Sequence, residues 1–278
     1  MVESCIESYR EWIAEMTELQ GTGDQLVEPL IASLNRYKSV VDFELIFDND
    51  DDFLYRQKGQ LKLDNTVLEE FLPWLVGRVF ADPLEGRGVV LGPTTAFSQL
   101  RFESDVLDNK RGGGMAVRSK DHDFAMARPL FLRASHREDF GDARTERTHL
   151  AYVAAEIKTN LDKTMFQEAS ATAYDLKLAL PSSRYFLLCE WLDMTPISTA
   201  VTSIEKVIVL RKARRLPADV RRHFATAAGR AENREVFQAH LNDHPFAPDA
   251  FRRFLGYVEQ LVTNGDQDED DVLERGWF

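Results

Sequence analysis

The segment Glu156-Ile157-Lys158 has the spacing that bears most directly on chemistry. It ends an apolar run, which predicts a strand over Leu150–Thr159. Side chains two apart on a strand point to the same face, so Glu156 and Lys158 project together while Ile157 points to the other face. A strand end that emerges into solvent has the same pattern, so the segment acquires a chemical meaning only from its neighbours.

Two aspartates precede this strand in a second strand-like run, Lys120–Ala134. Asp121 and Asp123 share strand parity, so either could lie beside Glu156; we favour Asp123, which abuts the apolar run, and interpret Asp121 as an exposed flank. Carboxylates from adjacent strands suit Mg²⁺, which is commonly held by one or two carboxylates together with substrate phosphate oxygens. A lysine beside the ion could orient or help deprotonate a water. The residues therefore indicate metal-assisted phosphodiester hydrolysis.

The elements that must position these residues form an α/β pattern. A helix is expected from about Asp162 to Leu180, and it presents Lys163 and Gln167 on one face, where they could approach a scissile phosphate or simply face solvent. Two further runs, Tyr185–Leu192 and Lys206–Leu210, are apolar on both faces, as central strands covered by helices are. The order strand, strand, helix, strand, strand predicts an α/β core with a mixed central sheet flanked by helices.

Helical patterns occupy both ends of the chain. We expect a mainly helical region over 1–86, a core over 87–216 and a helical region with an acidic tail over 217–278, or one compact domain that contains all three. Thr66 and Glu69 have the spacing of a capping box at the start of a helix. The run Arg111–Gly114 (RGGG) is expected to be a flexible break between strand-like segments.

Composition excludes several classes of protein. The 278 residues are 44% hydrophobic, and none of the chain approaches the roughly 18 uninterrupted apolar residues of a membrane span. The first residues carry acidic side chains where a signal peptide would carry basic ones. Two cysteines are too few for a disulfide framework, so we expect a cytoplasmic protein. The net charge is −12, but residues 101–222 hold 21 basic and 17 acidic side chains, so the middle of the chain is basic and a nucleic-acid partner is not excluded.

Further candidates lie around this centre. Glu103 could supply an additional acid near the metal, or it could be a surface side chain. The densest basic cluster could neutralise DNA phosphates, or it could be a solvated loop and helix. Its members are Arg211, Lys212, Arg214, Arg215, Arg221 and Arg222.

Three stretches carry a resemblance to a known family: KDHDFAMARPLFLRASH, LAYVAAEIKTNLDKTMFQEASATAYDLK and YFLLCEWLDMTPIST. They resemble the PD-(D/E)XK nuclease superfamily and, within it, the type II restriction endonucleases of the Bpu10I family, relatives of the enzyme BbvCI. The resemblance covers about Lys120 to Arg215. It implies a PD-(D/E)XK core in which Asp123, Glu156 and Lys158 are catalytic, with Asp123 and Glu156 as ligands of Mg²⁺. His122 stands where the motif has its proline, so the residue before Asp123 departs from the motif.

The resemblance implies sequence-specific hydrolysis of double-stranded DNA. One such site cuts one strand, so we expect either a homodimer or a heterodimer with a related subunit, which some relatives form. Two other functions fit the same residues. A PD-(D/E)XK nuclease of DNA repair would lack strict sequence specificity, and a non-catalytic DNA-binding or assembly subunit would use Glu156 and Lys158 only to neutralise each other.

Overall fold

The computed structural model describes residues 2–60, 62–263, 273–274 and 276. The acidic run Asp266–Asp271 lies outside these residues. Five strands form one sheet in the order β1-β2-β3-β4-β5. The first three are antiparallel, and β3, β4 and β5 are parallel, so the expected α/β fold with a mixed sheet is confirmed. The strands are β1 Val90–Arg101, β2 Ala116–Ala134, β3 Arg144–Leu161, β4 Arg184–Leu192 and β5 Ile204–Arg214.

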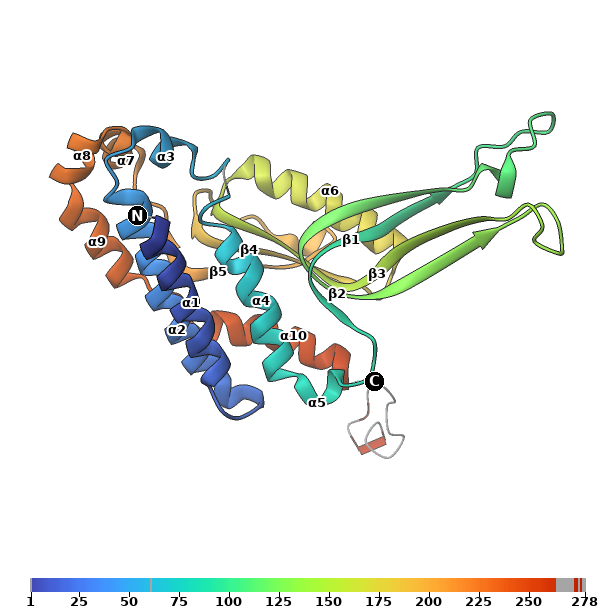
Figure 1. Ribbon diagram of the computed structural model, residues 1–278, viewed down its shortest axis with the longest axis horizontal. Helices are drawn as coiled ribbons and strands as arrows, with labels where there is room; N and C mark the ends of the chain where they lie inside the picture. Colours follow the sequence, from blue (N-terminus) through green and yellow to red (C-terminus); the bar gives the residue numbers. More distant parts are fainter. Residues whose placement is uncertain (1, 61, 264–272, 275, 277–278) are drawn as a thin grey trace.

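Helices precede the sheet, follow it and cross between β3 and β4 (Figure 1). Within the described residues, no helix has the length and apolar character that crossing a membrane requires. The helices before the sheet are α1 Val2–Glu18, η1 Gly23–Leu26, α2 Val27–Ser39, the π-helix η2 Val40–Phe47, α3 Asp52–Gln57, α4 Thr66–Val79 and α5 Ala81–Leu84. The others are η3 Arg111–Gly114, α6 Lys163–Ala179, η4 Thr199–Val201, α7 Ala218–Arg221, η5 Arg222–Ala225, α8 Ala227–Glu232, α9 Arg234–Asp243 and α10 Pro248–Thr263.

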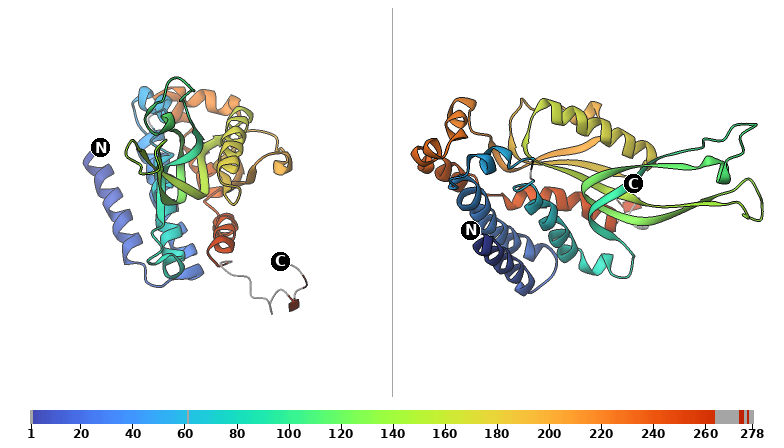
Figure 2. Two further views of the ribbon diagram at one scale, coloured as in Figure 1. Left: turned by 90° about the vertical axis from the view of Figure 1, so that its right-hand side faces the viewer. Right: turned by 45° about the horizontal axis from the view of Figure 1, so that its top comes forward.

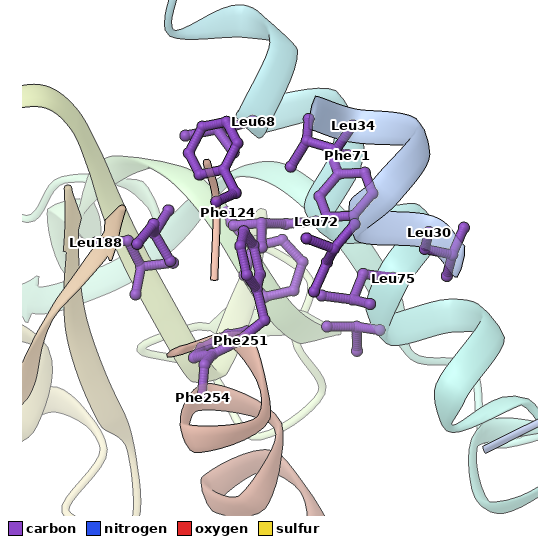
Figure 3. Packing of buried hydrophobic residues seen from close by; sticks show 14 of the residues in the cluster. Leu30, Leu34, Leu68, Phe71, Leu72, Leu75, Phe124, Leu188, Phe251 and Phe254 are labelled. Carbon is purple, nitrogen blue, oxygen red and sulfur yellow. The ribbon is translucent and has the colours of Figure 1, made fainter. Parts of the chain in front are cut away.

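Helices cover both faces of the sheet, with α6 on one side and α4 and α10 on the other (Figure 2). The largest cluster of buried apolar side chains lies on the α4 and α10 side and draws on both ends of the chain as well as on the sheet. In Figure 3, Phe124 of β2 packs among Phe71 of α4 and Phe251 and Phe254 of α10. Burying each such ring contributes on the order of 2 kcal/mol, so this layer holds β2 and β3 firmly from one side.

Alternation along β3 assigns the charged residues to the other face. Val153, Ala155 and Ile157 belong to the cluster under α4 and α10, and Ala154 belongs to the smaller cluster under α6. Glu156 and Lys158 have the parity of Ala154, so they lie on the face that α6 covers. The predicted separation of these two side chains from Ile157 is confirmed.

The strands β1, β2 and β3 extend beyond the helices as a projecting arm (Figure 1). β2 bends strongly, so the β1–β2 and β2–β3 hairpins point the same way and fold against each other. Ser119 Oγ, in the first half of β2, is 3.4 Å from Thr148 Oγ1 of β3, although the strand partner of Thr148 is Leu130 in the second half of β2. Asp123 lies between these two halves.

Three local predictions are wrong. β5 is the edge of the sheet and not a central strand; its apolar residues are explained by α6 and α10, which contact it. No capping box forms at α4, because Thr66 Oγ1 donates to the carbonyl of Lys62 and Glu69 pairs with the Lys62 ammonium. The third is the run Arg111–Gly114.

Arg111–Gly114 is an ordered turn where the tips of the two hairpins meet. Its three glycines are buried and have positive φ. A Cβ on Gly112 would lie 2.7 Å from the backbone nitrogen of Arg144 and 2.8 Å from the carbonyl oxygen of Ala134. Glycine is therefore required here for close approach of two backbones, rather than for flexibility.

Candidate active site

Asp123 and Glu156 lie where β2 and β3 stop pairing. Phe124 pairs with Ala155 across the antiparallel ladder, and at the next step the Ile157 N–H donates to Asp123 Oδ2 at 2.8 Å instead of to a backbone carbonyl. The carboxylate therefore takes a strand partner's place and is fixed against β3. Strand divergence at this step leaves room for side chains between the two strands. It brings Asp123 beside Glu156, as predicted, while Asp121 accepts a hydrogen bond from Thr95 on β1.

Glu156 is held by two neighbours. Its Oε1 is 2.6 Å from Lys158 Nζ, and its Oε2 accepts a hydrogen bond of 2.7 Å from the hydroxyl of Tyr185. The side chains of Glu156 and Lys158 are 22% and 25% exposed, so both are reachable from solvent. Tyr185 is buried, and burial together with the Glu156 charge raises the pKa of its hydroxyl, which therefore stays a donor.

The sequence interpretation missed Tyr185. Tyr185 is the second residue of β4 and pairs with Ala154, two residues before Glu156 on the neighbouring parallel strand. A polar aromatic residue at the start of an otherwise apolar strand was the available signal. It could be used only with the β3–β4 register in hand, which the sequence does not provide.

Lys62 approaches Asp123 from the segment before α4. Its Nζ is 3.8 Å from Asp123 Oδ1 and 3.2 Å from Glu69 Oε1. The hydrogen bond to Glu69 is the largest of several effects that raise the pKa of Lys62. Neither Lys62 nor Glu69 was a sequence candidate for the site, because no periodicity links a loop residue to a strand 61 positions away.

His122, which replaces the motif's proline, is buried and lies against Tyr185 with ring centroids 6.0 Å apart. Burial lowers the pKa of His122, against the opposing charges of Glu156 and Asp123. Among the described residues, neither ring nitrogen has a hydrogen-bond partner. The ring thus packs against Tyr185, close enough to Glu156 and Asp123 to feel their charges.

The accessory candidates lie elsewhere. Glu103 follows β1 at the far end of the arm, where it pairs with Arg101 at 3.0 Å. Lys163 and Gln167 are exposed on the first turns of α6, whose buried side includes Phe166. In the described part of the chain, no hydrogen bond or ion pair joins Glu103, Lys163 or Gln167 to the carboxylates.

The basic cluster divides into buried and exposed members. Arg211 is buried and pairs with Asp42 and Glu190. Arg215 and Arg221 share Asp193, at 2.8 and 3.7 Å, and Lys212 pairs with Asp249. Arg214 and Arg222 are exposed. The members able to meet a DNA backbone are therefore the exposed ones, and Arg211 is held inside the protein.

Asp123 and Glu156 fit a hard divalent ion. Both offer carboxylate oxygens, and both are partly exposed, at 22% each. Among the described residues, no three His, Cys, Asp or Glu side chains form a ready-made metal cage. Two carboxylates completed by water and substrate oxygens match Mg²⁺, which keeps several waters and rarely uses an all-protein cage.

Comparisons with known proteins agree with this fold. No match was found among curated proteins. A solved structure of the native BbvCI A2B2 tetramer is similar to this chain, with a TM-score of 0.53 and 18% identity over 86% of this chain and 88% of that chain. The family model of the Bpu10I restriction endonucleases matches residues 60–278. This match includes Asp123, Glu156 and Lys158 as well as the whole sheet, and it shows that the chain belongs to the Bpu10I restriction endonuclease family, whose members are type II restriction enzymes.

Proposed function

We propose that this restriction endonuclease hydrolyses DNA phosphodiester bonds in a Mg²⁺-dependent reaction at Asp123, Glu156 and Lys158. The observation that carries the proposal is the convergence of these three side chains, all partly exposed, at the point where β2 and β3 diverge. Restriction endonucleases typically use a divalent metal ion, and the donor set suits Mg²⁺. The proposal also places the enzyme in the cytoplasm, with double-stranded DNA as its substrate.

Each side chain has a separate role. Asp123 and Glu156 would hold the ion, which when bound polarises the phosphate and stabilises the leaving oxygen. Lys158, at hydrogen-bond distance from Glu156, would orient the attacking water through its ammonium group. Tyr185 fixes the second oxygen of Glu156, so the carboxylate cannot rotate away from the site.

Cutting both strands needs two such sites. BbvCI, whose fold this chain shares, is described as an A2B2 tetramer. We propose that this chain likewise works with a second copy or a related subunit. A homodimer would read a palindromic sequence because its twofold axis gives each subunit the same half-site, whereas an asymmetric sequence would require a different partner.

Digestion of a sequenced plasmid by the purified chain tests the function. With Mg²⁺ we expect discrete fragments whose mapped ends share one sequence, and with EDTA we expect intact plasmid. Fragments with ends at unrelated sequences would favour a repair nuclease. Intact plasmid with Mg²⁺, both alone and after addition of a related subunit, would indicate a non-catalytic chain.

A further inference from the structure

Lys62 faces one carboxylate oxygen of Asp123, a proposed ligand of the metal ion. Of the two Asp123 oxygens, Oδ2 already accepts the Ile157 N–H, and the Lys62 ammonium faces the other, Oδ1, at 3.8 Å. A divalent ion bound at that oxygen would place a second positive charge beside the ammonium. Lys62 and the ion therefore compete for one carboxylate.

The backbone holds Lys62 in this place at a cost. Lys62 has a φ of 54°, in the left-handed region that a side chain with a Cβ disfavours. Hydrogen bonds on both sides fix the conformation, since its N–H donates to the Gly59 carbonyl and its own carbonyl accepts the Thr66 N–H. Strain that surrounding contacts maintain beside a charged site is a recognised mark of function.

Neighbouring residues anchor the segment to the catalytic strand. Asn65 hydrogen-bonds to Thr159, the residue after Lys158. Asp64 is buried and pairs with Lys58 at 3.5 Å. These contacts hold the residues that follow Lys62, whereas the Lys62 side chain is 57% exposed and has a flexible stem that can turn toward solvent.

We propose that Lys62 is a further residue of the active site, which exchanges Asp123 for a DNA phosphate when a divalent ion binds. The proposal rests on the proposed function. Once an ion takes Asp123 Oδ1, the ammonium loses that anion and is repelled by the ion. A phosphate that reaches the same ion then comes within reach of Lys62, and ammonium to phosphate contacts are strong charge-assisted hydrogen bonds. Glu69 holds the ammonium close to the site in both states.

The first arm of the test is a calorimetric titration of Mn²⁺ without DNA. Lys62→Met removes the competing charge and keeps the length of the side chain, so Mn²⁺ affinity should rise on the order of tenfold. Lys110→Met is the matched control, because Lys110 is also an exposed lysine in an ion pair, with Asp108, and its affinity should equal that of the wild type. Equal or weaker Mn²⁺ binding by Lys62→Met would overturn the exchange.

The second arm measures the salt dependence of DNA binding in EDTA and in Ca²⁺, a non-cleaving ion. In Ca²⁺, the slope of log affinity against log salt should be smaller for Lys62→Met than for wild type by about 0.9, the value of one phosphate contact. In EDTA the slopes should agree. Equal slopes for Lys62→Met and wild type in Ca²⁺ would overturn the exchange. So would a slope that is smaller for Lys62→Met by the same amount in Ca²⁺ and in EDTA.

A third variant separates this inference from the proposed function. Asp123→Asn should lose Mn²⁺ binding. If it keeps the affinity of the wild type, the metal assignment fails. If it loses binding while Lys62→Met behaves as wild type in both arms, the metal assignment stands and only the exchange fails.

Discussion

Two clusters of charged side chains lie on opposite faces of the same sheet, and they differ mainly in their access to water. Glu156 and Lys158 lie on the α6 side and are about one-quarter exposed. Glu190, on β4, lies on the other side and pairs with Lys38 at 2.8 Å and Arg211 at 3.1 Å, with Lys38 and Glu190 fully buried. Both clusters join carboxylates to cations. The comparison shows that residue types alone identify both clusters as candidate catalytic sites. Solvent exposure then distinguishes the cluster that a substrate can reach from the one that it cannot.

Burial also changes what the second cluster can do. Burial raises the pKa of Glu190. Burial alone would lower the pKa of Lys38, but the charges of Asp42 and Glu190 outweigh it and raise the value. Every charge there has a partner, including Arg211 with Asp42 at 3.2 Å. The network joins α2, η2, β4 and β5, and removing one partner would leave a buried charge uncompensated. Its groups are buried and ion-paired, so a DNA phosphate does not reach them.

Lys158→Ala tests the exposed side of the comparison and should have a large effect. Its ammonium lies beside Glu156 and serves the attacking water, so single-turnover cleavage should fall by about 10²- to 10⁴-fold. Calorimetric Mn²⁺ binding should not weaken, because both carboxylates remain and a positive charge beside Glu156 is removed. A large loss of Mn²⁺ affinity would instead assign Lys158 a structural role in the metal site.

Arg211→Met tests the buried side. Removing one partner leaves Glu190 and Asp42 short of a cation in a buried site, so the free energy of unfolding should fall by about 3–5 kcal/mol. Arg222→Met is the control: Arg222 is exposed, and its removal should change stability by less than about 0.5 kcal/mol. Chemical denaturation measures both. Equal, small effects would mean that the network contributes nothing to stability.

Tyr185→Phe should have an intermediate effect, because it removes only the hydroxyl that holds Glu156 Oε2. Loss of one hydrogen bond to a carboxylate predicts cleavage about tenfold slower. Tyr174→Phe, which removes an exposed hydroxyl on α6, should cut like the wild type. If the Tyr185 variant also cuts like the wild type, Glu156 needs no positioning.

His240 lies beside the buried network and tests how that side of the sheet responds to pH. It stacks on Trp191, and burial, with the charges of His244 and Arg211, lowers its pKa to about 4. The unfolded chain binds the proton near pH 6.5, so stability should be full above that pH and decline as pH falls from about 6.5 toward 4. We expect the free energy of unfolding, measured by denaturation at pH 7 and at pH 5, to fall less in His240→Gln than in the wild type. If the variant loses as much stability as the wild type, titration of other groups causes the decline.

Sequence reasoning predicted the strands and the proximity of Asp123, Glu156 and Lys158 because both depend on local rules, while the family resemblance implied their catalytic role. Alternation along Leu150–Thr159 predicts that Glu156 and Lys158 share a face, and an aspartate beside an apolar run predicts Asp123 on the neighbouring strand. The contacts around the triplet depend on tertiary structure instead. Tyr185 requires the β3–β4 register, and Lys62 requires a loop to fold over a strand, neither of which periodicity contains.

The same limit explains the basic cluster and the arm. Arg211 follows the apolar part of β5 just as its exposed neighbours do, and only the packing of η2 and β4 against it makes it a buried counter-ion. The bend that folds β2 back on itself leaves no clear pattern in the sequence. The glycines at Arg111–Gly114 were visible, but their role in a close backbone contact was not.

The most direct test of the account compares cleavage with DNA binding for Asp123→Ala and Glu156→Ala. Each substitution removes a carboxylate from the exposed cluster, so plasmid cleavage with Mg²⁺ should be abolished. Sequence-specific binding in a Ca²⁺ gel shift should persist, because the surface that contacts the backbone is unchanged. Near-normal cleavage by Glu156→Ala would contradict the assignment of the catalytic centre, and near-normal cleavage by Asp123→Ala alone would move the metal ligand to Asp121.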